Sequence, residues 1–288
     1  MVPEREGWLE TEITGKLRPV GGVFRQIRGT MNTFVFDIET VPDVASARRL
    51  YQLEDLDDKN VARVMFHKRA EETGGSEFLR HHLHRIVAIS VVLRTQERFR
   101  VWTLGDADAP EQELLQRFFD GIDRFTPTLV SWNGSGFDLP VIHYRSLLHG
   151  IVAPRYWDTG GTDRDFRWNN YISRYHERHT DLMDVLSGYQ PRAAAKLDEI
   201  ATLMGFPGKM GMSGAQVWDS YLDGDLDGIR NYCETDVLNT YLVFQRFELI
   251  RGHLSEAGYR KACDEVRQEL AAQDKPHLTE FLANWREA

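Results

Sequence analysis

The order of hydrophobic patterns in the first half of this chain constrains its fold more than any other feature. Strand-like runs of β-branched and aromatic residues lie at 33–38, 84–93, 98–104 and 128–133. A polar turn joins the second and third runs, which therefore read as a hairpin. Apolar residues recur at helical spacing in 109–125 and 138–150. This mixture of strands and helices predicts an α/β fold, with a mixed sheet flanked by helices.

Composition narrows the class of protein. The 288 residues carry a net charge of −9, from 44 acids against 35 bases, which argues against broad electrostatic binding of nucleic acid but permits local binding through metal ions. The sequence lacks the run of roughly 18 apolar residues that a membrane helix needs, and its polar first 20 residues lack a signal-peptide core. We therefore expect a cytoplasmic protein with no membrane partner.

Carboxylates interrupt the hydrophobic patterns at three places. Asp37 and Glu39 stand two apart in the first strand, so they point to the same face. Asp138 opens a predicted helix after a Gly-rich turn, where capping alone could explain an acid. Tyr232 and Asp236 are one turn apart on a predicted helix, a pair that is often a surface or core detail when it occurs alone.

Taken together, the three places predict a metal site. Neighbouring carboxylates resist ionising together, and Mg²⁺ or Mn²⁺, which prefer oxygen ligands, would neutralise that repulsion. Two such ions about 3.5–4 Å apart can stabilise the attacking and leaving oxygens during phosphodiester cleavage. We therefore expect two divalent cations as cofactors.

Three short motifs, in order, resemble those of DEDD-type 3′–5′ exonucleases of the ribonuclease H-like fold. "FDIET" (36–40) is similar to the first exonuclease motif and "NGSGFD" (133–138) to the second. In the third, Tyr232 lies four residues before Asp236, whereas the other subclass would carry histidine at the position of Asn231. Over roughly residues 32–250 the chain looks like the proofreading domain of family B DNA polymerases, and no polymerase domain is expected in the same chain.

The resemblance implies a role for each matching residue. Asp37 would bridge both metals, Glu39 and Asp236 would support the ion that activates water, Asp138 would hold the second ion, and Tyr232 would orient the water. Candidate substrate contacts are Thr40, Asn133, Phe137 and Lys209. The implied function is hydrolysis at single-stranded nucleic acid 3′ ends, favouring DNA over RNA. An exoribonuclease that trims RNA and a non-catalytic nucleic-acid-binding module remain as alternatives.

We predict three regions in the chain. Residues 1–30 form an N-terminal extension of uncertain status, 31–252 the exonuclease domain, and 253–288 a helical tail packed on that domain. A protein that starts at Met31 is expected to fold and cleave, because the first strand begins two residues later.

Other polar and aromatic features leave alternatives open. His81, His82 and His84 lack a neighbouring acid or cysteine and suggest a solvated loop. Asp181 and Asp184 suggest capping or a surface role, and Cys233 a small core residue. The segment 151–179 interleaves aromatic residues with arginines, which fits either substrate contact or the packing of a long loop.

Overall fold

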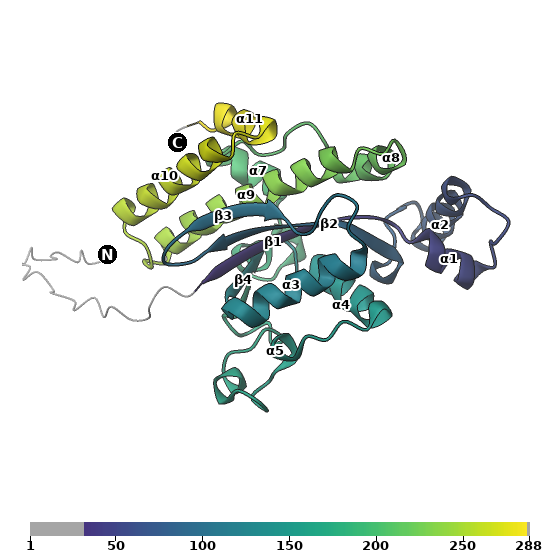
Figure 1. The fold of residues 1–288 in the computed structure, drawn as a ribbon, viewed down its shortest axis with the longest axis horizontal. Coiled ribbons are helices and arrows are strands. Elements are labelled where there is room, and N and C mark those ends of the chain that lie inside the picture. The colour runs from purple at the N-terminus through teal and green to yellow at the C-terminus, as the bar shows by residue number, and fades with distance from the viewer. Residues whose placement is uncertain (1–31, 287–288) are drawn as a thin grey trace, which may run out of the picture.

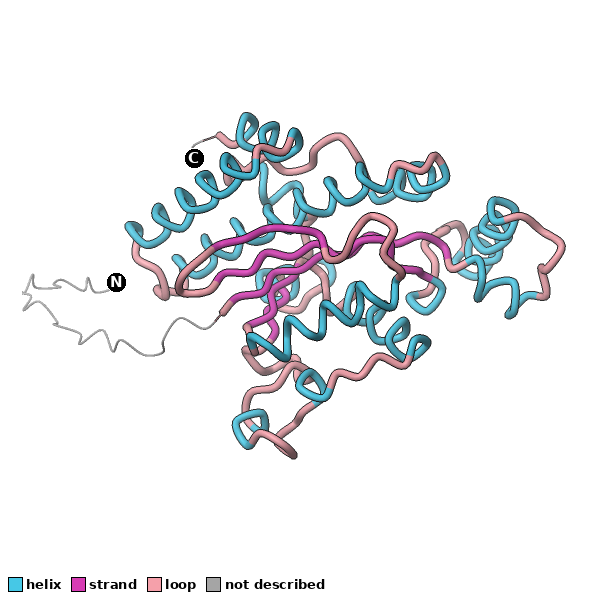
Figure 2. The backbone as a smooth tube through the Cα atoms, in the orientation of Figure 1, coloured by secondary structure: helices cyan, strands magenta, loops and turns pink. Residues whose placement is uncertain are grey.

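A five-stranded mixed sheet forms the centre of the computed structural model, which describes residues 32–286 (Figures 1 and 2). Its order is β3-β2-β1-β4-β5. The strands are β1 (Thr33–Pro42), β2 (His84–Arg94), β3 (Phe99–Thr103), β4 (Thr128–Ser131) and β5 (His179–Asp181). β2 is antiparallel to β1 and β3, whereas β4 is parallel to β1 and β5. This arrangement confirms the predicted α/β class, with a mixed sheet flanked by helices.

Helices cover both faces of the sheet (Figure 1). On one face lie α3 (Glu111–Phe125), α4 (Asp138–His149) and α5 (Pro154–Trp157). On the other lie α7 (Leu197–Leu203), α9 (Leu226–Ile250), α10 (Glu256–Gln273) and α11 (Pro276–Asn284). Shorter elements connect them: α6 (Leu182–Leu186), α8 (Val217–Leu222), and the 3₁₀ turns η1 (His81–Leu83), η2 (Arg164–Arg167), η3 (Pro191–Ala193) and η4 (Gly214–Gln216). The sequence patterns did not predict α8.

Two further helices project beyond the end of β1. α1 (Val44–Tyr51) and α2 (Asp58–Thr73) are inserted between β1 and β2, and they extend to the side of the sheet in Figure 1. They share a small apolar core of their own, which includes Ala47, Met65 and Leu79. This pair, with the 74–80 loop that returns to the sheet, is called the arm below.

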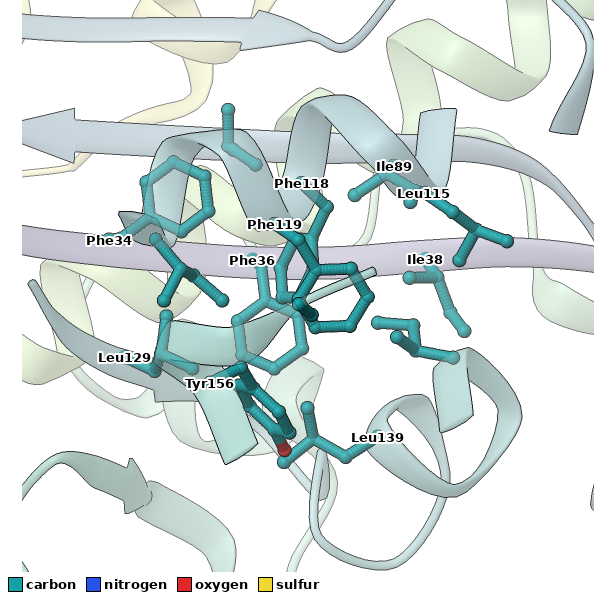
Figure 3. Close-up of a cluster of buried hydrophobic side chains, with 14 of the residues drawn as sticks. Phe34, Phe36, Ile38, Ile89, Leu115, Phe118, Phe119, Leu129, Leu139 and Tyr156 are labelled. Carbon is teal, nitrogen blue, oxygen red and sulfur yellow. The ribbon is translucent and has the colours of Figure 1, made fainter. Parts of the chain in front are cut away.

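Alternation along β1 divides the main core into two layers. Phe34, Phe36 and Ile38 lie in the cluster on the α3 side, where the rings of Phe34 and Phe36 meet Phe118 (Figure 3). Val35 points to the opposite face, into a second cluster that includes residues of α9. Asp37 and Glu39 follow Val35 in this alternation and therefore lie on the α9 side of the strand.

The C-terminal helices belong to the second core layer. Val266 and Leu270 of α10, and Leu278 and Phe281 of α11, are buried in the same cluster as Val35. The expectations for residues 1–30 and for Met31 lie outside the described residues. Among residues 32–286, the helices are all too short or too polar to cross a bilayer.

Candidate active site

The two acids of β1 lie beside the N-terminal half of α9. Glu39 is buried and Asp37 is half-buried. Cys233 of α9 lies with its Sγ 3.5 Å from the Asp37 carbonyl oxygen and 3.6 Å from Oδ2. The pairing of β1 with β2 shifts register between Glu39 and Thr40, and such an irregularity re-aims the side chains beside it. The irregularity therefore follows directly after the two carboxylates, and the pairing continues from Thr40 to Pro42 in a shifted register.

Asp138 joins the same cluster from the other side of the sheet. It is the first residue of α4 and is buried. Its Oδ1 accepts a hydrogen bond from the backbone N–H of Ile38 at 3.2 Å. Because Ile38 lies between Asp37 and Glu39, this bond fixes the helix start against the acid-bearing part of β1.

The turn before α4 depends on Asp181, at the end of β5. The Asp181 carboxylate accepts backbone N–H bonds from Asn133 at 2.9 Å and from Ser135 at 2.8 Å. It also caps α6, so the predicted capping role is confirmed. Gly134 has no room for a side chain, because a Cβ there would lie 2.3 Å from the Ser131 hydroxyl oxygen. Sequence reasoning missed the hydrogen bonds between Asp181 and this turn. The available signal was the position of Asp181, an acid at the end of a strand.

α9 brings Tyr232 and Asp236 to the cluster. The tyrosine hydroxyl lies beside the Asp236 carboxylate, and the two groups shift each other's pKa. Burial raises the pKa of Tyr232, and the negative charges of Asp236 and Glu39 raise it further. The phenol therefore stays neutral at pH 7. Cys233 is fully buried, and burial raises the pKa of its thiol, which confirms it as a core residue.

All four carboxylates have raised pKa values. For Asp37 the largest cause is burial, followed by the charges of Asp138, Glu39 and Asp236. Burial, then Asp236 and Asp138, raises the pKa of Glu39. Burial raises the pKa of Asp138 to about 7 and that of Asp236 to about 6. The structure thus brings together all four acids that the sequence singled out, and they disfavour one another's ionisation.

Oxygen ligands for a cation are within reach of one another. Ligand atoms of Asp37, Glu39 and Cys233 all lie within 4.8 Å of each other. The thiol is a weak candidate ligand because its pKa is raised, and metals bind the thiolate. The remaining donors are carboxylates, the ligand type that Mg²⁺ and Mn²⁺ prefer.

Lys209 supplies a positive charge to this cluster. Its ammonium group lowers the pKa of both Glu39 and Asp236, against the larger effect of burial. The turn that carries it is held by buried Asn239 of α9, which donates to the Gly208 carbonyl at 2.8 Å and accepts from the Gly208 N–H at 3.2 Å. Asn239 was not predicted. It lies three residues after Asp236, so helical spacing was the signal that could have revealed it.

Comparison with known proteins identifies the family. A family model described as a predicted 3′–5′ exonuclease related to the exonuclease domain of PolB matches residues 76–285. The chain belongs to this family. The match confirms the resemblance that the motifs indicated, and it identifies the chain as an exonuclease. It includes Asp138, Tyr232 and Asp236, whereas Asp37 and Glu39 precede it in the sequence.

Among solved structures, the exonuclease is similar to the family B DNA polymerase of the hyperthermophilic archaeon Pyrobaculum calidifontis. The TM-score is 0.46 and the identity 14%, over 84% of this chain and 29% of the polymerase. The exonuclease therefore spans less than a third of that protein's length. A search of curated protein sequences found no match.

Thr40, Phe137, His81 and His84 lie together at one edge of the exonuclease site. The Thr40 hydroxyl oxygen lies 2.8 Å from Nδ1 of His84. His84 is buried, and it begins β2, so the predicted solvated loop is wrong for this residue. The neighbouring imidazole of His81 bonds to the Gly136 carbonyl at 2.9 Å. Sequence reasoning failed for His84 because tertiary contacts, which a local polar pattern does not show, bury its ring.

The segment 151–179 of the exonuclease packs at the opposite end of β4. The Tyr171 hydroxyl donates to the Pro127 carbonyl at 2.6 Å, and Arg178 donates to that of Thr126. Tyr171 is buried in the core. The packing alternative therefore holds for this part of the segment. Trp168, by contrast, is 80% exposed.

Proposed function

We propose that this exonuclease is metal-dependent and hydrolyses phosphodiester bonds at single-stranded 3′ ends, with DNA favoured over RNA. The observation that carries the proposal is the convergence of four carboxylates from β1, α4 and α9, beside a tyrosine whose pKa they raise. A cluster with raised pKa values is a repulsive arrangement, and burying it is reasonable when divalent cations neutralise it.

The donor set suits two Mg²⁺ or Mn²⁺ ions. Asp37, Glu39, Asp138 and Asp236 offer carboxylate oxygens only, and the nearby Lys209 ammonium balances only part of their charge. In this proposal Asp37 would contact both ions, Glu39 and Asp236 would hold one, and Asp138 would hold the other. When bound, two such ions stabilise the charge on the attacking and leaving oxygens of a phosphodiester.

Tyr232 orients the attacking water in this proposal. Its raised pKa leaves a neutral hydroxyl, which can both donate and accept a hydrogen bond. A neutral phenol beside carboxylates is a poor proton acceptor, so its work is positioning rather than proton removal. Lys209 sits close enough to the acids to meet a substrate phosphate as well.

A preference for DNA is supported by the family description, which relates the chain to the exonuclease domain of PolB. Trimming of RNA would need contacts that accept the 2′-hydroxyl. A non-catalytic binding module gains nothing from buried, mutually repelling acids. The cytoplasmic location remains a prediction from the sequence.

Digestion of 5′-labelled single strands tests the proposal. DNA and RNA of equal sequence are incubated with Mg²⁺, Mn²⁺ or EDTA. We expect the DNA to shorten stepwise from its 3′ end with either metal and to stay intact in EDTA. Release of the 5′ label as first product, or undiminished cleavage in EDTA, would contradict the proposal. Faster loss of RNA would overturn the preference for DNA.

A further inference from the structure

Three rings, one exposed, one partly buried and one buried, form a contiguous aromatic cluster beside the carboxylates. The ring centroids of Phe78 and Phe137 are 5.5 Å apart, those of Phe78 and His84 are 5.4 Å apart, and those of His84 and Phe137 are 5.1 Å apart. Phe137 and Phe78 come from segments far apart in the sequence. We call these three residues the aromatic rim.

The aromatic rim is bound closely to two of the acid-bearing segments. Phe137 directly precedes Asp138 at the start of α4. His84 bonds through Nδ1 to Thr40, the residue after Glu39. A nucleotide whose phosphate lies at the carboxylates would therefore have its base within reach of these rings.

Phe78 belongs to the arm, and the structure presents its ring to solvent. The side chain is 57% exposed, although exposure of apolar surface is unfavourable. Its backbone is fixed, because Arg69 of α2 donates from Nε to the Phe78 carbonyl at 2.8 Å. The next residue, Leu79, is buried in the core of the arm. The arm thus holds an exposed aromatic ring at the edge of the site.

We propose that Phe78 is a base-stacking residue, which together with Phe137 receives an unpaired base at or next to the 3′ end. The inference rests on the proposed function and adds to it the feature of the substrate that is recognised. Stacking of a base on an aromatic side chain contributes about 1–3 kcal/mol and tolerates any base. A base inside a duplex is already stacked and paired, so the aromatic rim selects unpaired ends.

Binding of intact and abasic strands tests the role of Phe78. Single-stranded DNA with a normal 3′ end is compared with strands that lack the base at the last or the next-to-last nucleotide. For the wild type we expect removal of the stacked base to weaken binding by roughly 5- to 150-fold, which is the stacking free energy converted to affinity. Phe78→Leu keeps an apolar contact with Phe137 but offers no stacking face, so it should lose most of this difference.

Two further variants serve as controls. Phe78→Trp retains a stacking face and should keep the wild-type difference between intact and abasic strands. Trp168→Ala removes a more exposed aromatic residue outside the aromatic rim and should also keep it. Equal discrimination by Phe78→Leu and the wild type would overturn the inference. If the wild type degrades no strand at all, the proposed function fails instead.

Discussion

At the scale of single residues, Asp138 links metal binding to pH. Its pKa is raised from 3.8 to about 7 in the fold, chiefly by burial. The folded state therefore holds this proton more tightly than the unfolded chain, and the stability it contributes is present below about pH 4 and is lost as pH rises through about 7. Metal binding requires the ionised carboxylate, so the two effects run in opposite directions with pH.

Thermal melting measures both effects of rising pH, the loss of stability and the gain in metal binding. Without metal, we expect the melting temperature to fall between pH 5.5 and pH 8. Mn²⁺ should raise it little at pH 5.5 and much more at pH 8, because fewer protons compete at the higher pH. Asp138→Asn keeps an acceptor for the Ile38 N–H and should reduce the dependence on pH. A Mn²⁺ effect of equal size at both pH values would contradict the assignment.

A substitution at Tyr232 tests whether its hydroxyl orients the attacking water. Tyr232→Phe keeps the ring and its packing but removes the hydroxyl that lies beside Asp236. A nucleophile displaced by about 1 Å can cost on the order of 100-fold in rate, so we expect a loss of that size with normal folding and strand binding. Single-turnover rates at saturating Mn²⁺ measure it. Asn231→Ala, at the neighbouring position, should cleave normally, and the reverse pattern would show that the third motif is misassigned.

At the scale of elements, two variants of the turn that carries Lys209 test the position of its ammonium group separately from the presence of its charge. Asn239→Ala leaves the Gly208 N–H buried without its partner, which costs about 1–3 kcal/mol in the free energy of unfolding. Lys209→Ala changes an exposed side chain and should alter stability by less than about 0.5 kcal/mol.

Both variants should cleave about 10- to 100-fold more slowly, because each removes the ammonium group from its place. Urea unfolding and single-turnover cleavage provide the two readings. An Asn239→Ala enzyme that is destabilised yet cleaves at the wild-type rate would show that the turn has only a structural role.

The second half of α4 is held against α3 and the end of β1 by a buried ion cluster. Arg145, two turns after Asp138, bonds to Asp43 just beyond β1 and to Glu111 of α3, with its Nε 2.7 Å from Glu111 Oε1. Arg145→Ala would leave both carboxylates buried without their cation, and we expect about 3–5 kcal/mol of lost stability by denaturant unfolding.

Arg117→Ala is the matched control for that loss. Arg117 pairs with Glu113 on the exposed side of α3, where an ion pair contributes less than about 1 kcal/mol. Similar losses for the two variants would show that the buried cluster does not hold α4 against β1.

At the scale of the whole molecule, the sequence predicts what local periodicity encodes. The strands β1 to β4 and the helices α3, α4 and α9 were visible in alternation or helical spacing, and the four acids in the three motifs. Contacts between distant segments were not visible. Asp181 reaches the Asn133 turn across 48 residues, and this requires the pairing of β4 with β5. Asn239 reaches Gly208 across 31 residues. Such bonds depend on the packed fold, so no pattern within one segment reveals them.

The measurement that tests the central claim most directly is single-turnover cleavage of strands with sulfur at the terminal phosphodiester. One non-bridging oxygen is replaced, and the two stereoisomers are compared in Mg²⁺ and in Mn²⁺. Mg²⁺ strongly prefers oxygen, whereas Mn²⁺ tolerates softer ligands better. If Asp37, Glu39, Asp138 and Asp236 hold ions against the phosphate, one isomer should be cleaved far more slowly in Mg²⁺ and should recover much of its rate in Mn²⁺. The same ratio of Mg²⁺ to Mn²⁺ rates for both isomers and for the unmodified strand would contradict direct metal contact.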